Sequence, residues 1–527
     1  MPLLSDYLDN TTPRGAQQAA FEAALANDLF ALFMEQRTGK TPVALGRIAY
    51  AHEVQKTCDS AIIVAMPSGV PQNWADEING DADLGRPKRW PARIDTTTLV
   101  WRANKTATKG FQAALKDAIE TKQFSFVLVN GEAILTDAFK EFAGKFLRKR
   151  QVFAVADETS LLIKTPSSKR TKVMSGIKKL TQQRLILDGT PAGESPLDLY
   201  SQVGWLDDKY LGHSSYFSFK NYYGEWEKGF DPRSGREFPK LKKNDDGTPM
   251  FRHLDELQRR LKACSFQVLR KDCFDMPDKI YQPYRFPLSP AQRQVYDDLE
   301  AEHEATLHDN SQVSVQHLLT RYLRFQQITS NFWPSDKTAA LHAACNGEGC
   351  EGCNQEGVVY SSTPPRVIDP NRHPRMDAMI ERIQLNSDPV IIWARFTADI
   401  EQIMKVCADL GCKPVRYDGK TSPDDKEISR RAFQSGRAGA LVANQAAAQR
   451  GLDLSAAGWH LYYSNTFSGL QRQQTEDRTE VPGRFRGTGV EDLIAEDTVD
   501  ENIVAAHLAK RSVAAFVMGQ PNTRRTT

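Results

Sequence analysis

The chain of 527 residues contains two series of short, continuous apolar runs, and these constrain its fold more than any other feature. Each run is followed by a polar turn and then by a helical pattern. Strands that are apolar on both faces are typical of parallel sheets covered by helices on both sides. The first series predicts an α/β lobe, and its runs are FALFM, AIIVAM (61–66), FSFVLVN (124–130), QVFAVAD (151–157) and RLILDG (184–189).

The second series lies late in the chain and predicts a second lobe of the same kind. Its runs are PVIIWA (389–394), PVRYDG (414–419), GALVAN (439–444) and HLYYSN (460–465). The region between the two series is rich in aromatic and charged residues, with helical patterns at 253–264, 290–307 and 315–328. We therefore expect two α/β lobes that flank a cleft, with helical protrusions between them.

Residues 34–41, MEQRTGKT, follow the first apolar run and end like a phosphate-binding loop. Gly39, Lys40 and Thr41 match the last three positions of the pattern G-x-x-x-x-G-K-[ST]. In that pattern the lysine reaches the β and γ phosphates and the hydroxyl holds Mg²⁺, at the start of a helix. Met34 stands where the pattern has glycine, and the alternative interpretation is a strand, a tight turn and a helix start.

A second acidic element, VADETS at 155–160, brings Asp157 and Glu158 to the end of an apolar run. Ligands of open α/β sheets bind at the carboxyl ends of the strands. Two carboxylates at that place divide the work of phosphoryl transfer, with Asp157 toward Mg²⁺ and Glu158 toward water. The alternative is a strand that simply runs into an acidic turn.

Composition restricts the partners of the chain. Charged residues make up 25% of the sequence, hydrophobic residues 40%, and the formal net charge is only +2. A nucleic-acid site must therefore be a local basic surface, and the candidates are 145–150 and the group Lys164, Lys169, Arg170 and Lys172. Each cluster is equally well explained as a solvated face. The sequence contains no stretch of ~18 apolar residues and no signal peptide, so we expect a cytoplasmic protein without a membrane partner.

Several stretches, in order, resemble the Swi/Snf-type ATPases of helicase superfamily two, especially their compact phage and bacterial forms. DETSLLIKTPSSKRTK (157–172) resembles the family's Walker B segment. Nine further blocks follow the family's order and include IVAMPSGVPQNWADEI (63–78), LILDGTPAGESPLDLYSQ (185–202), ALVANQAAAQRGLDLSAA (440–457) and SNTFSGLQRQQTEDR (464–478). The resemblance spans about residues 14 to 518 and implies two RecA-like lobes, with ATP and Mg²⁺ as cofactors.

The resemblance also implies roles for individual residues. Arg14 and Gln17 match the segment that recognises adenine, and Thr190 matches the motif that couples the nucleotide site to the nucleic-acid path. Arg478 matches an arginine finger, which stabilises charge on the transferring phosphoryl group when the lobes close. The second lobe would face the nucleotide with Gly451, Asp453 and Gln474.

The chain departs from this family at two places. Relatives have a second arginine three residues after the first, where this chain has Val481, so either Arg484 or Arg486 substitutes for it or one finger suffices. Relatives often have glycine at the position of Arg37, and Met34 is the other departure in the phosphate loop. We expect these changes to alter the rate of hydrolysis rather than abolish it.

A glycine-rich cluster at 342–357, HAACNGEGCEGCNQEG, has the spacing of a zinc knuckle. Cys345, Cys350 and Cys353 would hold one structural Zn²⁺, with His342 or His373 as the fourth ligand. The alternative is a loop with free thiols.

From these observations we expect an ATPase motor that translocates on double-stranded DNA through backbone contacts, in a cytoplasm that belongs to a bacterial host if the chain is phage-encoded. The alternatives are a strand-separating DNA or RNA helicase and a nucleic-acid-binding scaffold with a degraded site. A monomer is the default expectation. The expected divisions are lobe one (1–204), its helical protrusion (205–278), the protrusion of lobe two with the zinc knuckle (279–385), lobe two with a C-terminal brace helix (386–518) and a disordered tail (519–527).

Overall fold

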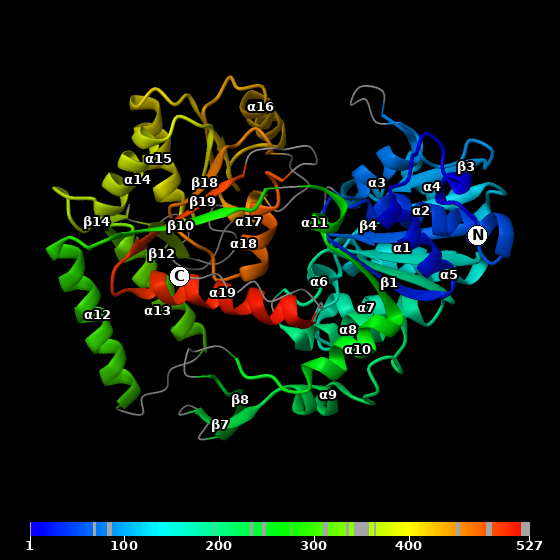
Figure 1. The fold of residues 1–527 in the computed structure, drawn as a ribbon, viewed down its shortest axis with the longest axis horizontal. Helices are drawn as coiled ribbons and strands as arrows, with labels where there is room; N and C mark the ends of the chain where they lie inside the picture. The colour runs from blue at the N-terminus through cyan, green and yellow to red at the C-terminus, as the bar shows by residue number, and fades with distance from the viewer. Residues whose placement is uncertain are drawn as a thin grey trace.

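The computed structural model forms two parallel sheets, each within an α/β lobe (Figure 1). Lobe one lies on the right of the view and lobe two on the left. The residues described are 2–66, 70–81, 87–193, 195–231, 236–244, 249–275, 277–308, 315–333, 337–341, 358–362, 365–448, 454–480 and 487–517. The fold class expected from the apolar runs is thereby confirmed.

Sheet one is parallel throughout and has seven strands in the order β3-β4-β2-β5-β6-β1-β9. All five apolar runs of the first series form strands of this sheet, within a residue of the expected limits. The strands are β1 (Leu29–Met34), β2 (Ser60–Ala65), β3 (Thr96–Val100), β4 (Phe124–Asn130), β5 (Val152–Asp157), β6 (Gln183–Asp188) and β9 (Ser265–Val268).

Helices cover both faces of sheet one, and the strands bury alternate side chains in two separate cores. In β5, for example, Val155 packs into one core while Ala154 and Ala156 pack into the other. This arrangement explains why the central strands are apolar at nearly every position. The helices of this lobe are α1 (Gly15–Leu25), α2 (Lys40–Tyr50), α3 (Val70–Asn79), α4 (Lys109–Glu120), α5 (Asp137–Lys149), α6 (Thr159–Leu162), α7 (Lys169–Lys178) and α8 (Leu199–Leu206).

Sheet two has six parallel strands in the order β10-β19-β18-β15-β17-β16. The four runs of the second series form four neighbouring strands, β18, β15, β17 and the edge strand β16. Its strands are β10 (Ile280–Phe286), β15 (Val390–Trp393), β16 (Pro414–Tyr417), β17 (Ala440–Ala443), β18 (Trp459–Tyr462) and β19 (Gly489–Ala495). The helices are α12 (Pro290–His308), α13 (Val315–Thr329), α14 (Pro374–Leu385), α15 (Thr397–Asp409), α16 (Pro423–Gln434), α17 (Gln445–Ala448), α18 (Gly469–Glu476) and α19 (Val499–Val517).

The region between the lobes differs from the expected helical protrusions. The helical patterns appear as α10 (Leu254–Cys264), α12 and α13, and α9 (Tyr216–Tyr223) is a further helix of this region. However, 205–278 also contains an antiparallel hairpin, β7 (Trp226–Asp231) with β8 (Arg236–Leu241), and ends in β9 of sheet one. Segment 279–385 begins with β10 of sheet two and also contains the strand pairs β11 (Phe332–Trp333) with β14 (Arg366–Val367) and β12 (Lys337–Leu341) with β13 (Val358–Ser362).

The connection between the lobes runs from β9 at the edge of sheet one, through α11 (Arg270–Cys273), to β10 at the edge of sheet two (Figure 1). A second crossing is made by α19, which packs against α10 of the first half of the chain. Within the described residues, no helix has both the length and the apolar character that a bilayer span requires.

Candidate functional site

The phosphate loop joins β1 to α2, and Lys40 is the first residue of that helix. Gly39 has φ +96°, in the left-handed region that favours glycine. A Cβ added there would lie 1.8 Å from Nε2 of Gln17, so a side chain would displace the Gln17 amide from the loop. Gly39 is therefore favoured by the backbone conformation and allows the Gln17 amide to approach.

Lys40 and Met34 interact directly, because Nζ of Lys40 donates to the carbonyl oxygen of Met34 at 2.8 Å. The Met34 side chain is fully buried in one core of lobe one. The side chain of Met34 thus packs in the core, while its carbonyl oxygen accepts a hydrogen bond from Lys40 of the loop. This explains how the loop keeps its form without the first glycine of the pattern.

The acidic pair lies at the carboxyl end of β5. Both oxygens of Asp157 accept hydrogen bonds, Oδ2 from Nε1 of Trp74 at 2.9 Å and Oδ1 from the backbone N–H of Glu158 at 3.0 Å. Burial raises the pKa of both carboxyl groups, and the Lys40 ammonium is the largest opposing influence on each. Glu158 also has φ +55°, a strained backbone that is found most often at functional sites.

A third carboxylate, Asp188, lies at the end of β6 and was not expected from the sequence. It accepts from the backbone N–H of Ser160 at 2.6 Å and from that of Thr190 at 2.7 Å. Its charge raises the pKa of Asp157 and of Glu158. Asp188 thereby connects the acidic pair to the Thr190 turn, and its place at the end of an apolar run was the signal that could have revealed it.

The donor set fits Mg²⁺ as such nucleotide sites hold it. Burial raises the pKa of both carboxyl groups and nearby cations lower it, so a bound cation would favour their charged forms. Mg²⁺ with nucleotides is usually held by one or two carboxylates and by the phosphates rather than by a protein cage. The described residues contain no cluster of three or more His, Cys, Asp or Glu that could hold a metal. Thr41 and Asp157 are the residues that would hold Mg²⁺ together with the phosphates.

The segment expected to recognise adenine lies against the loop. Gln17 is 6% exposed, its Nε2 donates to the Thr38 carbonyl at 3.3 Å, and its Oε1 accepts from the Arg14 backbone N–H at 2.9 Å. The Arg14 guanidinium lies 4.5 Å from the ring centre of Phe274, just after α11. Arg14 and Gln17 are thus next to the loop, and their role toward adenine stays a prediction.

Arg478 follows α18 in lobe two and reaches the first lobe. Its carbonyl oxygen accepts from the backbone N–H of Leu454 and from Nη2 of Arg37 in the phosphate loop, each at 3.1 Å. Its guanidinium is among the cations that lower the pKa of Glu158. Burial lowers the pKa of Arg478 itself, and Glu158 is the largest influence that opposes this shift. The Arg478 segment thus contacts the phosphate loop, and its charge acts on Glu158, although 320 positions separate the two residues in the sequence.

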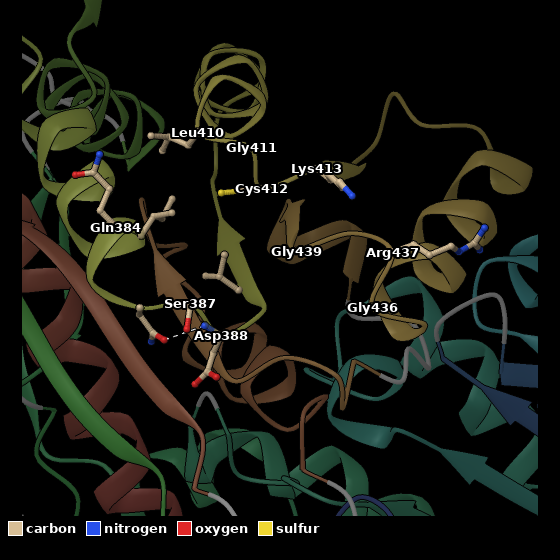
Figure 2. A pocket seen from close by; sticks show the side chains of 13 residues that line it. Gln384, Ser387, Asp388, Leu410, Gly411, Cys412, Lys413, Gly436, Arg437 and Gly439 are labelled. Carbon is tan, nitrogen blue, oxygen red and sulfur yellow. Dashed lines mark hydrogen bonds between the residues drawn. The ribbon is translucent and has the colours of Figure 1, made fainter.

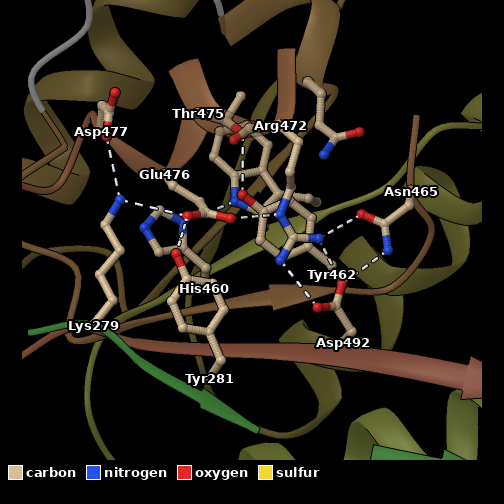
Figure 3. A network of polar contacts seen from close by, with 12 residues as sticks. Lys279, Tyr281, His460, Tyr462, Asn465, Arg472, Thr475, Glu476, Asp477 and Asp492 are labelled. Atoms are coloured by element: carbon tan, nitrogen blue, oxygen red, sulfur yellow. Dashed lines mark hydrogen bonds and ion pairs between the residues drawn. The ribbon is translucent and has the colours of Figure 1, made fainter. Parts of the chain in front are cut away.

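A buried polar network holds α18 in lobe two (Figure 3). Ser468 is the N-cap of the helix, and its Oγ accepts from the Gln471 backbone N–H at 3.2 Å. Arg472 pairs with Glu476 at 2.8 Å and with Asp492 of β19 at 2.5 Å. Its guanidinium also lies 3.2 Å from the ring centre of Tyr462. These contacts fix the helix that precedes Arg478.

Gln474 of the same helix is 2% exposed, and its Oε1 is a buried acceptor without a hydrogen-bond donor among the described residues. The other expected contacts of lobe two, Gly451 and Asp453, lie outside the described residues, as do Val481, Arg484 and Arg486. The Thr190 turn does meet lobe two, because a Cβ on Gly193 would lie 2.9 Å from Cδ1 of Leu470.

Most of the expected zinc site, His342, Cys345, Cys350 and Cys353, also lies outside the described residues. The alternative ligand His373 is described and caps α14, with Nδ1 accepting from the Met376 backbone N–H at 3.3 Å. Its Nε2 lies 3.4 Å from the Tyr463 hydroxyl, and burial lowers the pKa of the ring to about 4. Both ring nitrogens of His373 thus have partners within lobe two.

The two basic clusters lie at opposite edges of sheet one. Lys164, Lys169 and Lys172 are exposed after β5, at the carboxyl edge. The cluster 145–150 precedes β5, and its Arg150 is only 6% exposed and pairs with Asp59 at 3.0 Å. The first cluster can meet a polyanion beside the acidic pair, whereas Arg150 stabilises the fold.

A cavity of about 690 Å³ occurs in lobe two, away from these residues (Figure 2). It lies at the amino ends of β15, β16 and β17, and Ser387, Asp388, Cys412 and Gly439 are among its lining residues. Ligands of parallel sheets bind at the opposite, carboxyl edge. The cavity is therefore separate from the nucleotide site.

Comparison with known proteins agrees with this arrangement. The SNF2-related domain matches residues 31–332, and the helicase conserved C-terminal domain matches residues 375–482. The SWI/SNF chromatin-remodeling complex subunit snf22 of Schizosaccharomyces pombe is 22% identical over 89% of this chain and 26% of its own. The human SWI/SNF-related matrix-associated actin-dependent regulator of chromatin subfamily A member 1 is 20% identical over 92% of this chain and 41% of its own.

A solved structure, described as the Sulfolobus solfataricus SWI2/SNF2 ATPase core in complex with dsDNA, is 17% identical, covers 98% of this chain and 97% of its own, and has a TM-score of 0.39. The chain spans less than half of the length of either curated relative named above. Because the SNF2-related domain covers more than half of the chain and the helicase C-terminal domain follows it, this protein belongs to the SNF2-related family of superfamily-two ATPases.

Proposed function

We propose that this protein is an ATP-dependent translocase on double-stranded DNA. The observation that carries the proposal is the contact between the lobes at Arg478, whose carbonyl oxygen accepts from Nη2 of Arg37 in the phosphate loop at 3.1 Å. The charge of Arg478 is also among those that lower the pKa of Glu158. A site composed of two lobes couples chemistry to motion, because hydrolysis and product release change what holds the lobes together.

The chain's own residues supply positioning and charge. Lys40 exchanges the Met34 carbonyl for phosphate oxygens, and Arg478 stabilises the charge that develops on the transferring group. Glu158 orients the attacking water, and its buried position favours uptake of a proton. Thr41 and Asp157 would hold Mg²⁺, which when bound would neutralise negative charge on the phosphates.

DNA contact is supported by the exposed Lys164, Lys169 and Lys172 at the carboxyl edge of sheet one. Ammonium groups of this kind bind backbone phosphates without reading sequence. Family membership agrees, since the relative from Schizosaccharomyces pombe bears the name of a chromatin-remodeling subunit. Double-stranded DNA is therefore the partner that we propose.

The test is ATP hydrolysis with and without duplex DNA, with Lys40→Ala as the control. We expect duplex DNA to stimulate turnover at least about tenfold and Lys40→Ala to abolish it, because that ammonium is the phosphate ligand. Displacement of a third strand from a triplex would then report translocation. ATP-dependent unwinding of a forked duplex would instead assign the chain as a helicase. If no ATP hydrolysis depended on Lys40 or was stimulated by duplex DNA, only the nucleic-acid-binding scaffold would remain.

A further inference from the structure

Two contacts join the phosphate loop of lobe one to the segment that carries Arg478 in lobe two. The first is the hydrogen bond from Nη2 of Arg37 to the Arg478 carbonyl, at 3.1 Å. The same carbonyl accepts from the backbone N–H of Leu454, which belongs to lobe two. Arg37 thus adds a donor from lobe one to a carbonyl that is already held within lobe two.

The backbone conformation of the loop does not favour an arginine at position 37. Arg37 has φ +67°, in the left-handed region where glycine is the least strained residue. Its guanidinium presents several N–H donors in a fixed fork, which suits a contact with a carbonyl across an interface. The position carries an arginine at a conformational cost, and the hydrogen bond to the Arg478 carbonyl is a contact that helps to offset it.

The second contact passes through Arg270, the first residue of α11 in the connection between the lobes. The backbone N–H of Arg270 donates to Oε2 of Glu35 in the phosphate loop, at 2.8 Å. Its guanidinium pairs with Asp477 at 2.9 Å and with Glu480 at 2.6 Å, and its side chain is only 7% exposed. Asp477 and Glu480 stand one residue before and two residues after Arg478.

Asp477 and Glu480 also pair with a second cation, Lys279, which belongs to lobe two. Lys279 lies 3.2 Å from Asp477 and 2.8 Å from Glu480, and it precedes β10 of sheet two. The charge of the two carboxylates is therefore balanced partly from lobe two. Of the two cations, Arg270 is the one whose backbone is bonded to the phosphate loop.

We propose that Arg37 and Arg270 are positioning residues that set the place of Arg478 relative to the phosphate loop. This inference rests on the role proposed above for Arg478 as the arginine finger. Both contacts begin in the loop that would bind the nucleotide phosphates, at Arg37 and at Glu35. A shift of this loop on nucleotide binding is therefore transmitted to the finger segment along two routes.

Arg37→Gly tests the first contact without disturbing the fold, because glycine adopts this positive φ without strain. We expect the kcat of duplex-stimulated ATP hydrolysis to fall about tenfold, the value of one charge-assisted hydrogen bond, while the Kd for ATP changes less than about twofold. The matched control is Lys56→Gly, an exposed residue of lobe one with φ +55°. This control should leave both quantities unchanged.

A double variant separates positioning from nucleotide binding. In protein that already carries Arg478→Ala, Arg37→Gly should cause no further loss of kcat, since there is no finger to position. Equal losses in both backgrounds would overturn the inference, and so would weaker ATP binding with unchanged kcat. If Arg478→Ala alone left turnover intact, the role of Arg478 in the proposed function would fail first.

Arg270→Lys tests the second contact. Lysine keeps the charge beside Asp477 and Glu480 but lacks the fork that bonds both, so the fold should remain while the finger loosens. Backbone hydrogen exchange over 469–480 gives a readout that is independent of turnover. We expect ATP to protect this segment in the unmodified protein and at least about threefold less in Arg37→Gly and Arg270→Lys. Equal protection in all three proteins would contradict the inference.

Discussion

Single residues in lobe two show how burial shapes this protein beyond the nucleotide site. Asp399 of α15 is 1% exposed and accepts hydrogen bonds from Ser330 at 3.1 Å and Ser464 at 3.4 Å. Burial raises the pKa of this carboxyl group from 3.8 to about 7, although the Arg375 guanidinium opposes the shift. The folded chain therefore keeps a proton at pH values where the unfolded chain releases it.

This shift predicts a pH dependence of stability with a definite sign. Between about pH 4 and pH 7 the folded state binds more protons at Asp399 than the unfolded state, so stability falls as pH rises through this window. The full effect is at most about 4 kcal/mol for a shift of this size. Asp399→Asn should remove it, so the variant should gain thermal stability over the unmodified protein at pH 8 and gain much less at pH 5.

Thermal unfolding at the two pH values measures this difference. Asp409→Asn, an exposed position at the end of the same helix, is the control and should follow the unmodified protein. A gain in Tm for Asp399→Asn that is the same at pH 5 and pH 8 would show that proton binding at this residue is not the cause.

At the scale of elements, most central strands were predictable, whereas the edge strands β3, β9 and β10 were not. β2, β4 and β5 are buried on both faces, so they read as continuous apolar runs. β3 at one edge of sheet one reads TTTLV, and its first three residues are only partly buried. β10 at the edge of sheet two reads IYQPYRF and is exposed at several positions, including Ile280 at 57%. Hydrophobic pattern cannot identify strands that keep one side in water.

The same limit applies to the candidate site. Gly39, Lys40, Asp157 and Glu158 could be proposed as site residues because a strand end and a short motif lie together in the sequence. Arg270 was missed because its partners, Glu35 and Asp477, are 235 and 207 residues away. Neither distance leaves a local pattern. Such pairs are visible only when the fold has brought the elements together.

The exposed lysines around α7 give a prediction at this scale. Ser168 caps the N-terminus of the helix, because its Oγ accepts from the Thr171 backbone N–H at 3.2 Å, so this end of the helix is fixed. Replacing Lys164, Lys169 and Lys172 together by alanine should weaken duplex binding and reduce the slope of log K against log salt by about 2 to 3. ATP affinity without DNA should stay unchanged.

Fluorescence anisotropy with a labelled duplex at several salt concentrations measures both quantities. Lys145 and Lys149, at the opposite edge of sheet one, form exposed pairs with Glu141 and Glu120, and their alanine variant is the matched control. An equal loss of duplex affinity in the two variants would mean that DNA does not bind specifically at the carboxyl edge of sheet one.

At the scale of the whole molecule, the account depends on two lobes that share one site. Lobe one contributes the phosphate loop and the acidic pair, and lobe two contributes Arg478, whose carbonyl oxygen accepts from Nη2 of Arg37 in the phosphate loop. Arg37, Arg270 and the packing of α19 on α10 connect the lobes. Met34 and Arg37, the departures within the phosphate loop, have structural explanations in the core of lobe one and in the contact between the lobes.

The central claim is that Arg478 completes the nucleotide site from the second lobe. The most direct test is ATP hydrolysis by Arg478→Ala under saturating ATP and duplex DNA, together with the Kd for ATP. The account predicts that kcat falls about 10³-fold, as expected for an arginine finger, while the Kd changes only slightly. A kcat within about threefold of the unmodified protein would contradict it.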